Sequence, residues 1–543
     1  MKNKSYFWLP FALSLAVVLG VLAGKWIGVT ETPTSSYLNT NKLDAVLDYI
    51  DTQYVDTIDN KELLDKVIPK ILSELDPHSS YIPAEDLETV NEELEGSFSG
   101  IGIQFNLMND TINIVSVISG GPSEKAGILP GDRIISVNDS AFVGADLTNE
   151  RVLSTLRGKK GSTVVLGIKR NTSPTPLRYE ITRGDIPVNS VDASFILEDK
   201  IGYVKISKFG RTTYDEFLTA LIKLKKFGAE SFIIDLRSNS GGYMDAAINM
   251  VNEFLPGKQL IVYTEGKAFP REEARSNGIG SFQNEQLIVL TDEWSASASE
   301  IFAGAIQDND RGLIVGRRSF GKGLVQRQIP LSDGSAVRLT IARYYTPSGR
   351  SIQKQYEPGH DDEYSMDIVN RYMHGEFFNE DSIKQNKDLK YYTANGREVY
   401  GGGGIMPDIF VARDTTGESS YYNQVINSGA LYQYAFDYTD KHREHLSQAQ
   451  DAQEIVQMLN EQALLNDFVN YAKKKGIQPR QRYIQISRKP IVNLLQALIA
   501  RNILGEEAYF QLVLRNDPTL DKAKTLLRNG EGRPVPPQTA HHE

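Results

Sequence analysis

QLIVLTDEWSASASEIFAGAIQDND, which spans residues 286–310, joins an apolar run to a segment with helical spacing. Residues 287–290 are consecutively apolar, and such a run is typical of a strand that is buried on both faces. In residues 300–310 the apolar side chains recur at intervals of three and four, which predicts a helix. The stretch therefore predicts a strand, a sharp turn that holds three alternate serines, and a helix.

The same alternation continues on both sides of this stretch. Apolar runs at 201–207, 231–237 and 312–317 are separated by segments with helical spacing, of which 212–228 and 244–255 are the clearest. Apolar, β-branched runs between amphipathic helices indicate an α/β domain with a buried sheet.

The chain of 543 residues is too long for a single core, so several domains are expected. We predict a multidomain α/β protein, divided as follows: a signal-anchor or signal peptide at 1–28, a helical region at 37–95, a strand-rich domain at 96–185, the α/β core at 186–412 with a polar insertion at 354–398, a helical extension at 413–530 and a disordered tail at 531–543.

The N-terminus has the pattern of a membrane-targeting segment. Lys2 and Lys4 precede an uncharged, mostly apolar run from Ser5 to Gly24. No A-x-A cleavage site follows, so an uncleaved anchor is favoured over a cleaved signal peptide. We expect the protein in the cell envelope, on the periplasmic side of the cytoplasmic membrane, either anchored or secreted.

Composition narrows the classes of function. The net charge of −10 and the pI near 5.4 argue against nucleic acid as a partner, because phosphate binding needs a basic face. The sequence has no cysteine, which excludes disulfides, thiolate zinc sites and a cysteine nucleophile. It also lacks a metal-ligand cluster, a phosphate-binding loop and a dinucleotide fingerprint, so we expect no metal and no cofactor.

A glycine loop opens the strand-rich domain. In FSGIGI, residues 98–103, Gly100 and Gly102 can leave the N–H groups of the segment Gly100, Ile101, Gly102 and Ile103 pointing into one concavity that suits a carboxylate. The strand that follows can accept an extended peptide at its edge. Together with AGILPGDRIISVN, residues 126–138, the loop resembles a PDZ domain, which implies a protein or peptide ligand with an exposed C-terminus. The alternative is a tight turn without a ligand.

The serine turn raises the question of a nucleophile. A serine between a strand and a helix is exposed beside the helix N-terminal N–H groups, which can stabilise an oxyanion. However, Ser297 and Glu300 have the spacing of a capping box, and taken alone this stretch favours the cap.

A serine nucleophile also needs a base, and no histidine lies in the α/β core segments. His78, in LDPHSSYI, precedes the strand-rich domain, so a triad with it would have to cross a domain. Lys322 lies between two glycines with apolar flanks, which would lower its pKa and let it act as a base. On a helix, Gln326 would face the same side and could orient the amine. The alternative interpretation is that Lys322 is an ordinary surface lysine in a glycine turn, without a catalytic role.

Several longer motifs agree in their order along the chain. They resemble the carboxyl-terminal processing proteases, also called tail-specific proteases, over about residues 37–412. The motifs are LDPHSSYI at 75–82, IIDLRSNSGGYMDAA at 233–247, TDEWSASASEIFAGAIQD at 291–308, SFGKGLVQ at 319–326, RYYTPSGRSIQ at 343–353 and GGGGIMPDI at 401–409.

The resemblance implies a serine endopeptidase that cleaves proteins near their C-terminal ends through a serine/lysine dyad and an acyl-enzyme. It places the nucleophile on Ser297, the general base on Lys322 and the orienting group on Gln326. It places the oxyanion hole on the N–H groups of Gly242 and Ala298. It also implies a crotonase-like or Clp-protease-like core preceded by the PDZ domain. With Ser297 as the nucleophile, Ser299 is a candidate for the helix cap, and a capping role for Ser297 stays open.

Three other interpretations fit the sequence less well. Asn239–Gly242 resembles the nucleophile motif of trypsin-like proteases with PDZ domains, but those carry the PDZ module after the protease. Ser351–Lys354 matches the S-x-x-K of penicillin-recognising enzymes, without their other motifs. A membrane-tethered PDZ scaffold without activity is disfavoured by the intact Ser297, Lys322 and Gln326. The sequence leaves open a homo-oligomer or an adaptor protein as a further partner, besides the membrane at the N-terminus.

Overall fold

The computed structural model describes residues 14, 40–108, 110–170 and 173–534. The chain divides into two compact units, residues 1–71 and 72–543. The first unit contains α2 (Thr40–Gln53) and most of α3 (Asn60–Ser73). The predicted signal-anchor lies, apart from Ser14, outside the described residues. Within the described ranges, no helix is long and apolar enough to span a membrane.

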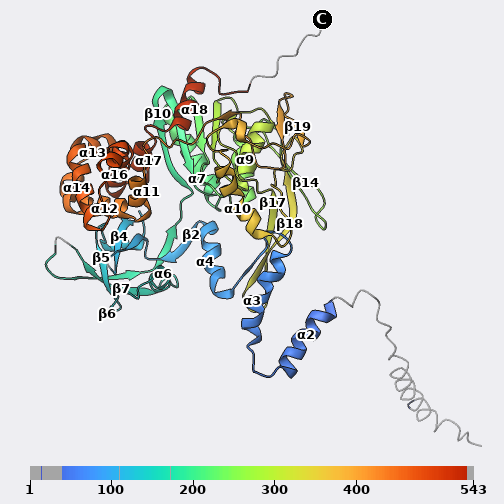
Figure 1. Ribbon diagram of the computed structural model, residues 1–543, viewed down its shortest axis with the longest axis horizontal. Helices are drawn as coiled ribbons and strands as arrows, with labels where there is room; N and C mark the ends of the chain where they lie inside the picture. Colours follow the sequence, from blue (N-terminus) through green and yellow to red (C-terminus); the bar gives the residue numbers. More distant parts are fainter. Residues whose placement is uncertain (1–13, 15–39, 109, 171–172, 535–543) are drawn as a thin grey trace, which may run out of the picture. The chain divides into compact units, whose positions relative to one another are not determined.

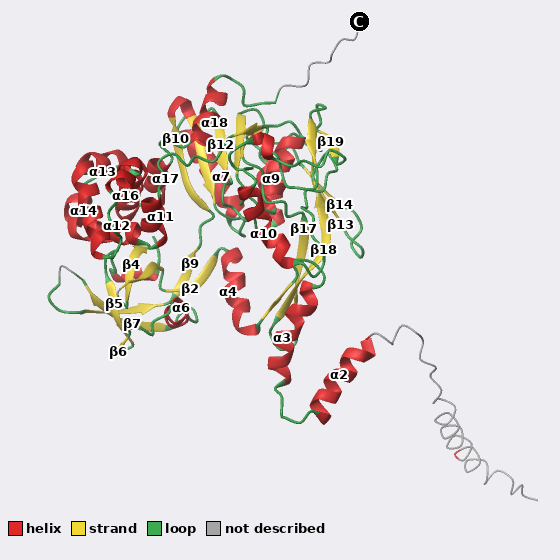
Figure 2. Cartoon of the chain, viewed as in Figure 1, coloured by secondary structure: helices red, strands yellow, loops and turns green. Residues whose placement is uncertain are grey.

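The second unit is built around a six-stranded sheet (Figure 2). Its strands follow the order β10-β11-β12-β15-β16-β21, and all neighbours are parallel except β10 and β11. The predicted strand–turn–helix at 286–310 is confirmed as β15 followed by α9. The strands are β10 (Val191–Leu197), β11 (Ile201–Ile206), β12 (Ser231–Asp235), β15 (Gln286–Thr291), β16 (Leu313–Gly316) and β21 (Ile409–Phe410), with the 3₁₀ turn η2 (Glu198–Lys200) between β10 and β11.

Helices cover both faces of this sheet. Successive side chains of a strand point to opposite faces, so Ile234 and Val289 pack on one side and Ile233 and Ile288 on the other. The first face is covered by α7 (Thr213–Lys226), α8 (Met244–Asn252) and α9 (Ala298–Asp308), and the second by α18 (Pro518–Arg528). The last helix of the predicted extension thus completes the core.

A second, antiparallel sheet lies beside the core and carries the segment after Lys322. Its order is β1-β18-β13-β14, and β17 also pairs with β18. The elements are β1 (Ser80–Ile82), β13 (Leu260–Glu265), β14 (Glu272–Arg275), β17 (Leu324–Pro330) and β18 (Ala336–Tyr345), with α4 (Ala84–Glu95) after β1. Because β1 pairs with β18, the LDPHSSYI segment is brought to the core.

The strand-rich domain has its own apolar core, which includes Ile112, Ile134 and Val164. Its main sheet has the order β3-β4-β5-β7-β8, so β3 is an edge strand. The elements are β2 (Ser97–Gly100), β3 (Ile103–Met108), β4 (Thr111–Val117), α5 (Pro122–Ala126), β5 (Arg133–Val137), β6 (Ser140–Ala141), α6 (Asn149–Leu156), β7 (Thr163–Lys169), β8 (Leu177–Thr182) and β9 (Gly184–Pro187).

The extension is mainly helical, whereas the insertion combines helix, a small hairpin and loops. The insertion contains α10 (Asp361–Met373), η3 (Glu380–Ser382), β19 (Lys390–Tyr392) and β20 (Glu398–Tyr400). The extension forms a helical domain with a separate apolar core. Its helices are α11 (Ser420–Asn427), α12 (Ala430–Leu446), α13 (Ala452–Met458), α14 (Glu461–Lys474), α15 (Gln481–Ile486), α16 (Arg488–Leu504) and α17 (Glu506–Val513).

Candidate active site

Ser297 differs from the two serines beside it. Ser295 Oγ donates to the carbonyl oxygen of Leu236 at 2.9 Å, and Ser299 Oγ donates to that of Asn239 at 2.9 Å. Both serines are fully buried, whereas Ser297 is partly exposed. Of the three hydroxyls, that of Ser297 can therefore meet a substrate.

The backbone at Ser297 is strained in a way that fits a functional residue. Its φ is 55° and its ψ is −115°, a conformation that residues with a Cβ rarely adopt. Ser297 is also the N-cap residue of α9, and its N–H donates to Glu300 Oε2 at 2.8 Å. The prediction that Ser299 caps this helix is wrong, because the Ser299 hydroxyl is used to hold the neighbouring turn.

That neighbouring turn follows β12 and approaches Ser297 closely. Because β12 and β15 are parallel neighbours, the loops after their carboxyl ends lie side by side. Gly241 has a φ of 102°, and a Cβ there would lie 2.7 Å from Ser297 Cβ and 2.9 Å from Ala298 N. Asn239 fixes the turn, since its Oδ1 accepts from Gly241 N at 2.9 Å and its Nδ2 donates to Ile206 O at 3.0 Å.

Two N–H groups beside Ser297 have no acceptor within the described part of the chain. The N–H of Gly242 and the N–H of Ala298 donate to no residue in the described part of the chain. Both belong to segments that contact Ser297, and Gly242 lines the same cavity as Ser297. Such N–H groups can hold the negative oxygen of a tetrahedral intermediate.

Lys322 is largely buried in this cavity. Burial is the main cause that lowers the pKa of its ammonium, and the positive charge of Arg338 lowers it further. Its Nζ donates to Gln326 Oε1 at 3.2 Å. A lysine with a lowered pKa can be neutral and accept a proton, so the environment suits a general base.

Gln326 is oriented by the segment before the strand-rich domain. Its Nε2 donates to the carbonyl oxygen of His78, which leaves Oε1 facing Lys322. The helical geometry considered for this pair is wrong, since residues 324–330 form β17. The contact instead arises because Lys322 lies in the loop just before the strand.

His78 is part of the site, although the sequence placed it before another domain. Its carbonyl oxygen holds Gln326, and its ring Nε2 is hydrogen-bonded to the hydroxyl of Tyr364 at 2.8 Å. Burial lowers the pKa of His78 to about 4, so the ring is neutral near pH 7. Asp76 fixes the segment by accepting from the N–H of His78 at 2.9 Å. The clustered polar residues of LDPHSSYI were the signal that could have placed it here.

Glu300 links Ser297 to the loop that holds Lys322. Its carboxylate is fully buried and accepts from Ser297 N at 2.8 Å, Gly321 N at 2.7 Å, Lys322 N at 2.9 Å and Ser319 Oγ at 2.5 Å. Burial raises the pKa of Glu300 to about 7, while these four donors favour the ionised form. The S-x-x-E spacing indicated the hydrogen bond from Ser297 N to Glu300, but not the bonds from the loop at residues 319–322.

The candidate active site is a cavity of about 530 Å³. It contains Ser297, Lys322 and Gln326 together with Gly242 and Arg338. No hydrogen bond joins Ser297 Oγ to Lys322 Nζ in the described structure, and catalytic contacts of this kind often tighten when substrate binds. Within the described residues there is no group of histidine and carboxylate side chains that could hold a metal ion.

A substitution at Arg338 tests whether the pKa of Lys322 controls the pH dependence of activity. Replacing Arg338 with glutamine removes a positive charge that lowers the pKa of Lys322, so that pKa should rise. The alkaline rise in kcat/KM for any peptide that the protein cleaves should then move to higher pH. Rate profiles between about pH 6 and pH 10 measure the shift. The exposed Arg343 on the same strand supplies the control substitution, and a profile that stays in place for Arg338→Gln would contradict a lysine base.

Three families match separate parts of the chain. Peptidase family S41 matches residues 200–362, and a PDZ domain matches residues 99–180. A family of unknown function, DUF8443, matches residues 421–505, which lie in the helical domain.

Known proteins are similar to this chain over more than half of its length. The chain is 37% identical over 329 residues to the carboxy-terminal-processing protease of Bartonella bacilliformis, a match that covers 60% of this chain and 75% of that protein. It is 36% identical over 318 residues to the carboxy-terminal processing protease CtpB of Bacillus subtilis, covering 58% and 66% respectively. Among solved structures, the photosystem II D1 C-terminal processing protease is 25% identical, with 70% of this chain and 88% of that one covered and a TM-score of 0.37.

Proposed function

The chain belongs to the carboxy-terminal processing proteases of peptidase family S41, and from this premise we propose that it is an endopeptidase that cleaves proteins near their C-termini with Ser297 and Lys322 as a catalytic dyad. The observation that carries the proposal is the convergence of a partly exposed serine, a largely buried lysine and the free N–H group of Gly242 in one cavity, with the free N–H group of Ala298 directly after the serine.

The chemical steps follow from this arrangement. Neutral Lys322 takes the proton of Ser297 Oγ, which attacks the carbonyl carbon of the substrate. The N–H groups of Gly242 and Ala298 bind the oxyanion. Breaking the C–N bond then leaves an acyl-enzyme, and the Lys322 ammonium returns the proton to the departing amine. Water activated by Lys322 hydrolyses the ester, which regenerates Ser297.

The glycine loop of the PDZ domain is proposed to hold the free C-terminus of the substrate. The carbonyl oxygens of Ile101 and Gly102 are occupied by the N–H groups of Ser123 at 2.9 Å and Ile118 at 3.0 Å. The N–H groups of Ile101 and Gly102 donate to nothing in the described ranges. Gly102 also has a φ of 78°, which turns the segment Gly100–Ile103 into a concave anion site.

A peptide with an amidated C-terminus is expected to lose at least about tenfold in kcat/KM relative to the same peptide with a free carboxylate. The carboxylate accepts charge-assisted hydrogen bonds, each worth roughly 1.5 kcal/mol or more, and about 1.4 kcal/mol corresponds to tenfold. Cleavage of both peptides by the wild-type chain measures the ratio. Gly102→Ala should shrink it, because alanine disfavours the φ of 78°. Equal cleavage of the two peptides would remove carboxylate recognition from the proposal.

The remaining parts of the proposal concern fold and location. We infer a crotonase-like or Clp-protease-like core, supported by parallel strands that alternate with helices. We also infer a location at the periplasmic side of the cytoplasmic membrane, supported by the lysines and the apolar run within residues 1–28. Fractionation of cells that express the full chain tests the location.

A further inference from the structure

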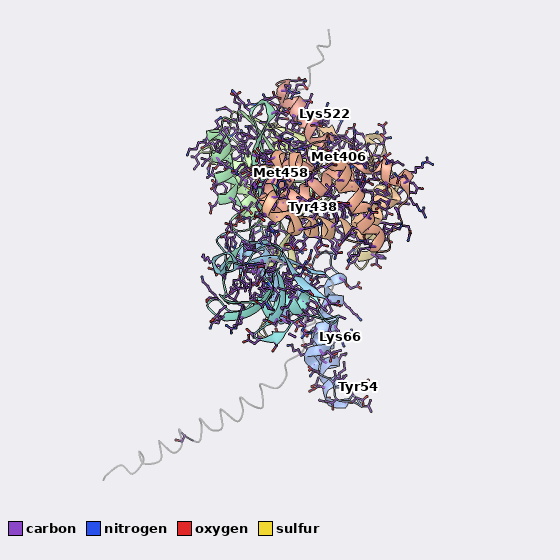
Figure 3. The ribbon with its side chains drawn as sticks, turned by 90° about the vertical axis from the view of Figure 1, so that its left-hand side faces the viewer. Tyr54, Lys66, Met406, Tyr438, Met458 and Lys522 are labelled. Carbon is purple, nitrogen blue, oxygen red and sulfur yellow. The ribbon has the colours of Figure 1, made fainter. Side chains whose placement is uncertain are left out.

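A second cavity, of about 620 Å³, lies between the PDZ domain and the helical domain. One wall is β3, which contributes residues 104–107, and the other wall comes from α12 and α16, which contribute Phe436 and Leu498 among others. Figure 1 shows these helices, in orange and red, next to β4 of the PDZ domain. Figure 3 gives the same arrangement from the side, with the helix that carries Tyr438, α12, above the strands.

The wall formed by β3 is the strand on which a peptide would add. It is the edge strand of its sheet, and it follows directly after the glycine loop. A chain whose carboxylate lies in that loop must run antiparallel to β3, away from its own C-terminus. The cavity therefore lies along the path of the residues that precede the substrate C-terminus.

The helical domain faces one side of this strand. Phe105 and Leu107 pack against the core of the PDZ domain, so Gln104 and Asn106 point to the opposite face. Gln104 Oε1 accepts from Ser116 Oγ at 2.8 Å on that face. Residues directly opposite in an antiparallel pair share a face. If the last substrate residue lies opposite Ile103, the fourth residue from the end lies opposite Asn106 and faces the helices.

The charge and the hydrogen bonding of the cavity point to the ligand. Its lining includes Lys475 and Arg501 and no carboxylate, although the chain has a net charge of −10. Arg501 Nε is buried and has no hydrogen-bond partner within the described residues. The nearest carboxylate contact of Arg501 is an ion pair with Glu506 at 3.9 Å. An acidic side chain would supply the missing acceptor for Arg501.

We propose that the helical domain forms a second wall of the PDZ groove and selects substrates with an acidic residue at the fourth position from the C-terminus. This inference rests on the proposed binding of substrate C-termini. It assigns a role in substrate recognition to residues 421–505, which match a family of unknown function.

Peptide binding to the full-length Ser297→Ala chain tests the proposal, since this variant should bind peptides without cleaving them. Two labelled ten-residue peptides carry glutamate or glutamine at the fourth position from a free C-terminus and are otherwise identical. The glutamate peptide is expected to bind about tenfold more tightly by fluorescence anisotropy. A third peptide carries glutamate at the third position, which faces the other side of β3, and should show no such gain.

Substitutions locate the effect on the helical wall. Lys475→Gln and Arg501→Gln should each lower the ratio of the affinity for the glutamate peptide to that for the glutamine peptide severalfold. Lys474→Gln is the matched control, because Lys474 is an exposed neighbour that does not line the cavity. Lys475 is exposed, so its variant should keep the fold even if that of Arg501 does not.

The outcomes separate this inference from the proposed function. Equal affinity for the glutamate and glutamine peptides, together with loss of binding on C-terminal amidation, would overturn the acidic selectivity and leave the proposed function intact. The selectivity is also wrong if it survives both lining substitutions. Binding that is insensitive to amidation would instead contradict the recognition of C-termini on which the inference depends.

Discussion

Replacing Ser297 with alanine is expected to lower kcat for peptide cleavage by about 10⁶-fold, the scale seen when a serine nucleophile is removed from a protease. Ser297 is the partly exposed serine of the turn, and it lies beside the free N–H groups of Gly242 and Ala298. Without its hydroxyl no acyl-enzyme can form. Rates of cleavage of a peptide with an apolar, free C-terminus provide the measurement.

The neighbouring serine supplies a control for this experiment. Ser299→Ala removes a buried hydroxyl that holds the turn at Asn239, so it should cost about 1–3 kcal/mol of stability. Its kcat should stay within about tenfold of the wild type, because this hydroxyl does not face the cavity. If Ser297→Ala kept a substantial fraction of activity in a homogeneous preparation, the nucleophile would have to be sought elsewhere.

Replacing Lys322 with arginine is expected to lower kcat by about 10³-fold or more, within the range attributed to general acid–base catalysis. Arginine keeps the positive charge but cannot lose its proton near neutral pH. In the wild type, burial lowers the pKa of Lys322, so the neutral amine becomes populated as pH rises and activity rises with it. The arginine variant should lack this alkaline limb, which pH–rate profiles would show.

Lys354 provides a matched control for that substitution. It is also buried, and its Nζ forms an ion pair with Asp367 at 3.0 Å and lies 4.1 Å from the ring centre of Phe320. Arginine can keep both contacts, so Lys354→Arg should retain most of the activity. A Lys322→Arg variant as active as Lys354→Arg would exclude Lys322 as the proton acceptor.

The elements of the core could be predicted from the sequence because their patterns are local. Apolar β-branched runs specify buried strands, and the predicted sequence of strand, serine turn and helix is the one observed at β15 and α9. The sequence also shows directly that no histidine lies in the α/β core segments. The family motifs then pointed to Ser297, Lys322 and Gln326 before any geometry was known.

Local sequence patterns do not reveal residues that act through a distant partner. Gln326 was considered on a helix, yet it lies on β17 and is oriented by a carbonyl 248 residues earlier in the chain. His78 was set aside because another domain follows it, but pairing of β1 with β18 brings its segment to the site. Glu300 was interpreted as a cap alone, because the donors from residues 319–322 are not visible in an S-x-x-E pattern.

The sequence by itself determined the types of element, the glycine loop and the small set of groups that could carry the chemistry, because hydrophobic period and turn residues act over a few neighbouring positions. The tertiary structure decided which of three serines is partly exposed, which acceptor faces Lys322 and which helices line the cavity beside β3. These depend on packing between segments far apart in the chain, and burial and hydrogen-bond partners are set by that packing rather than by any local pattern.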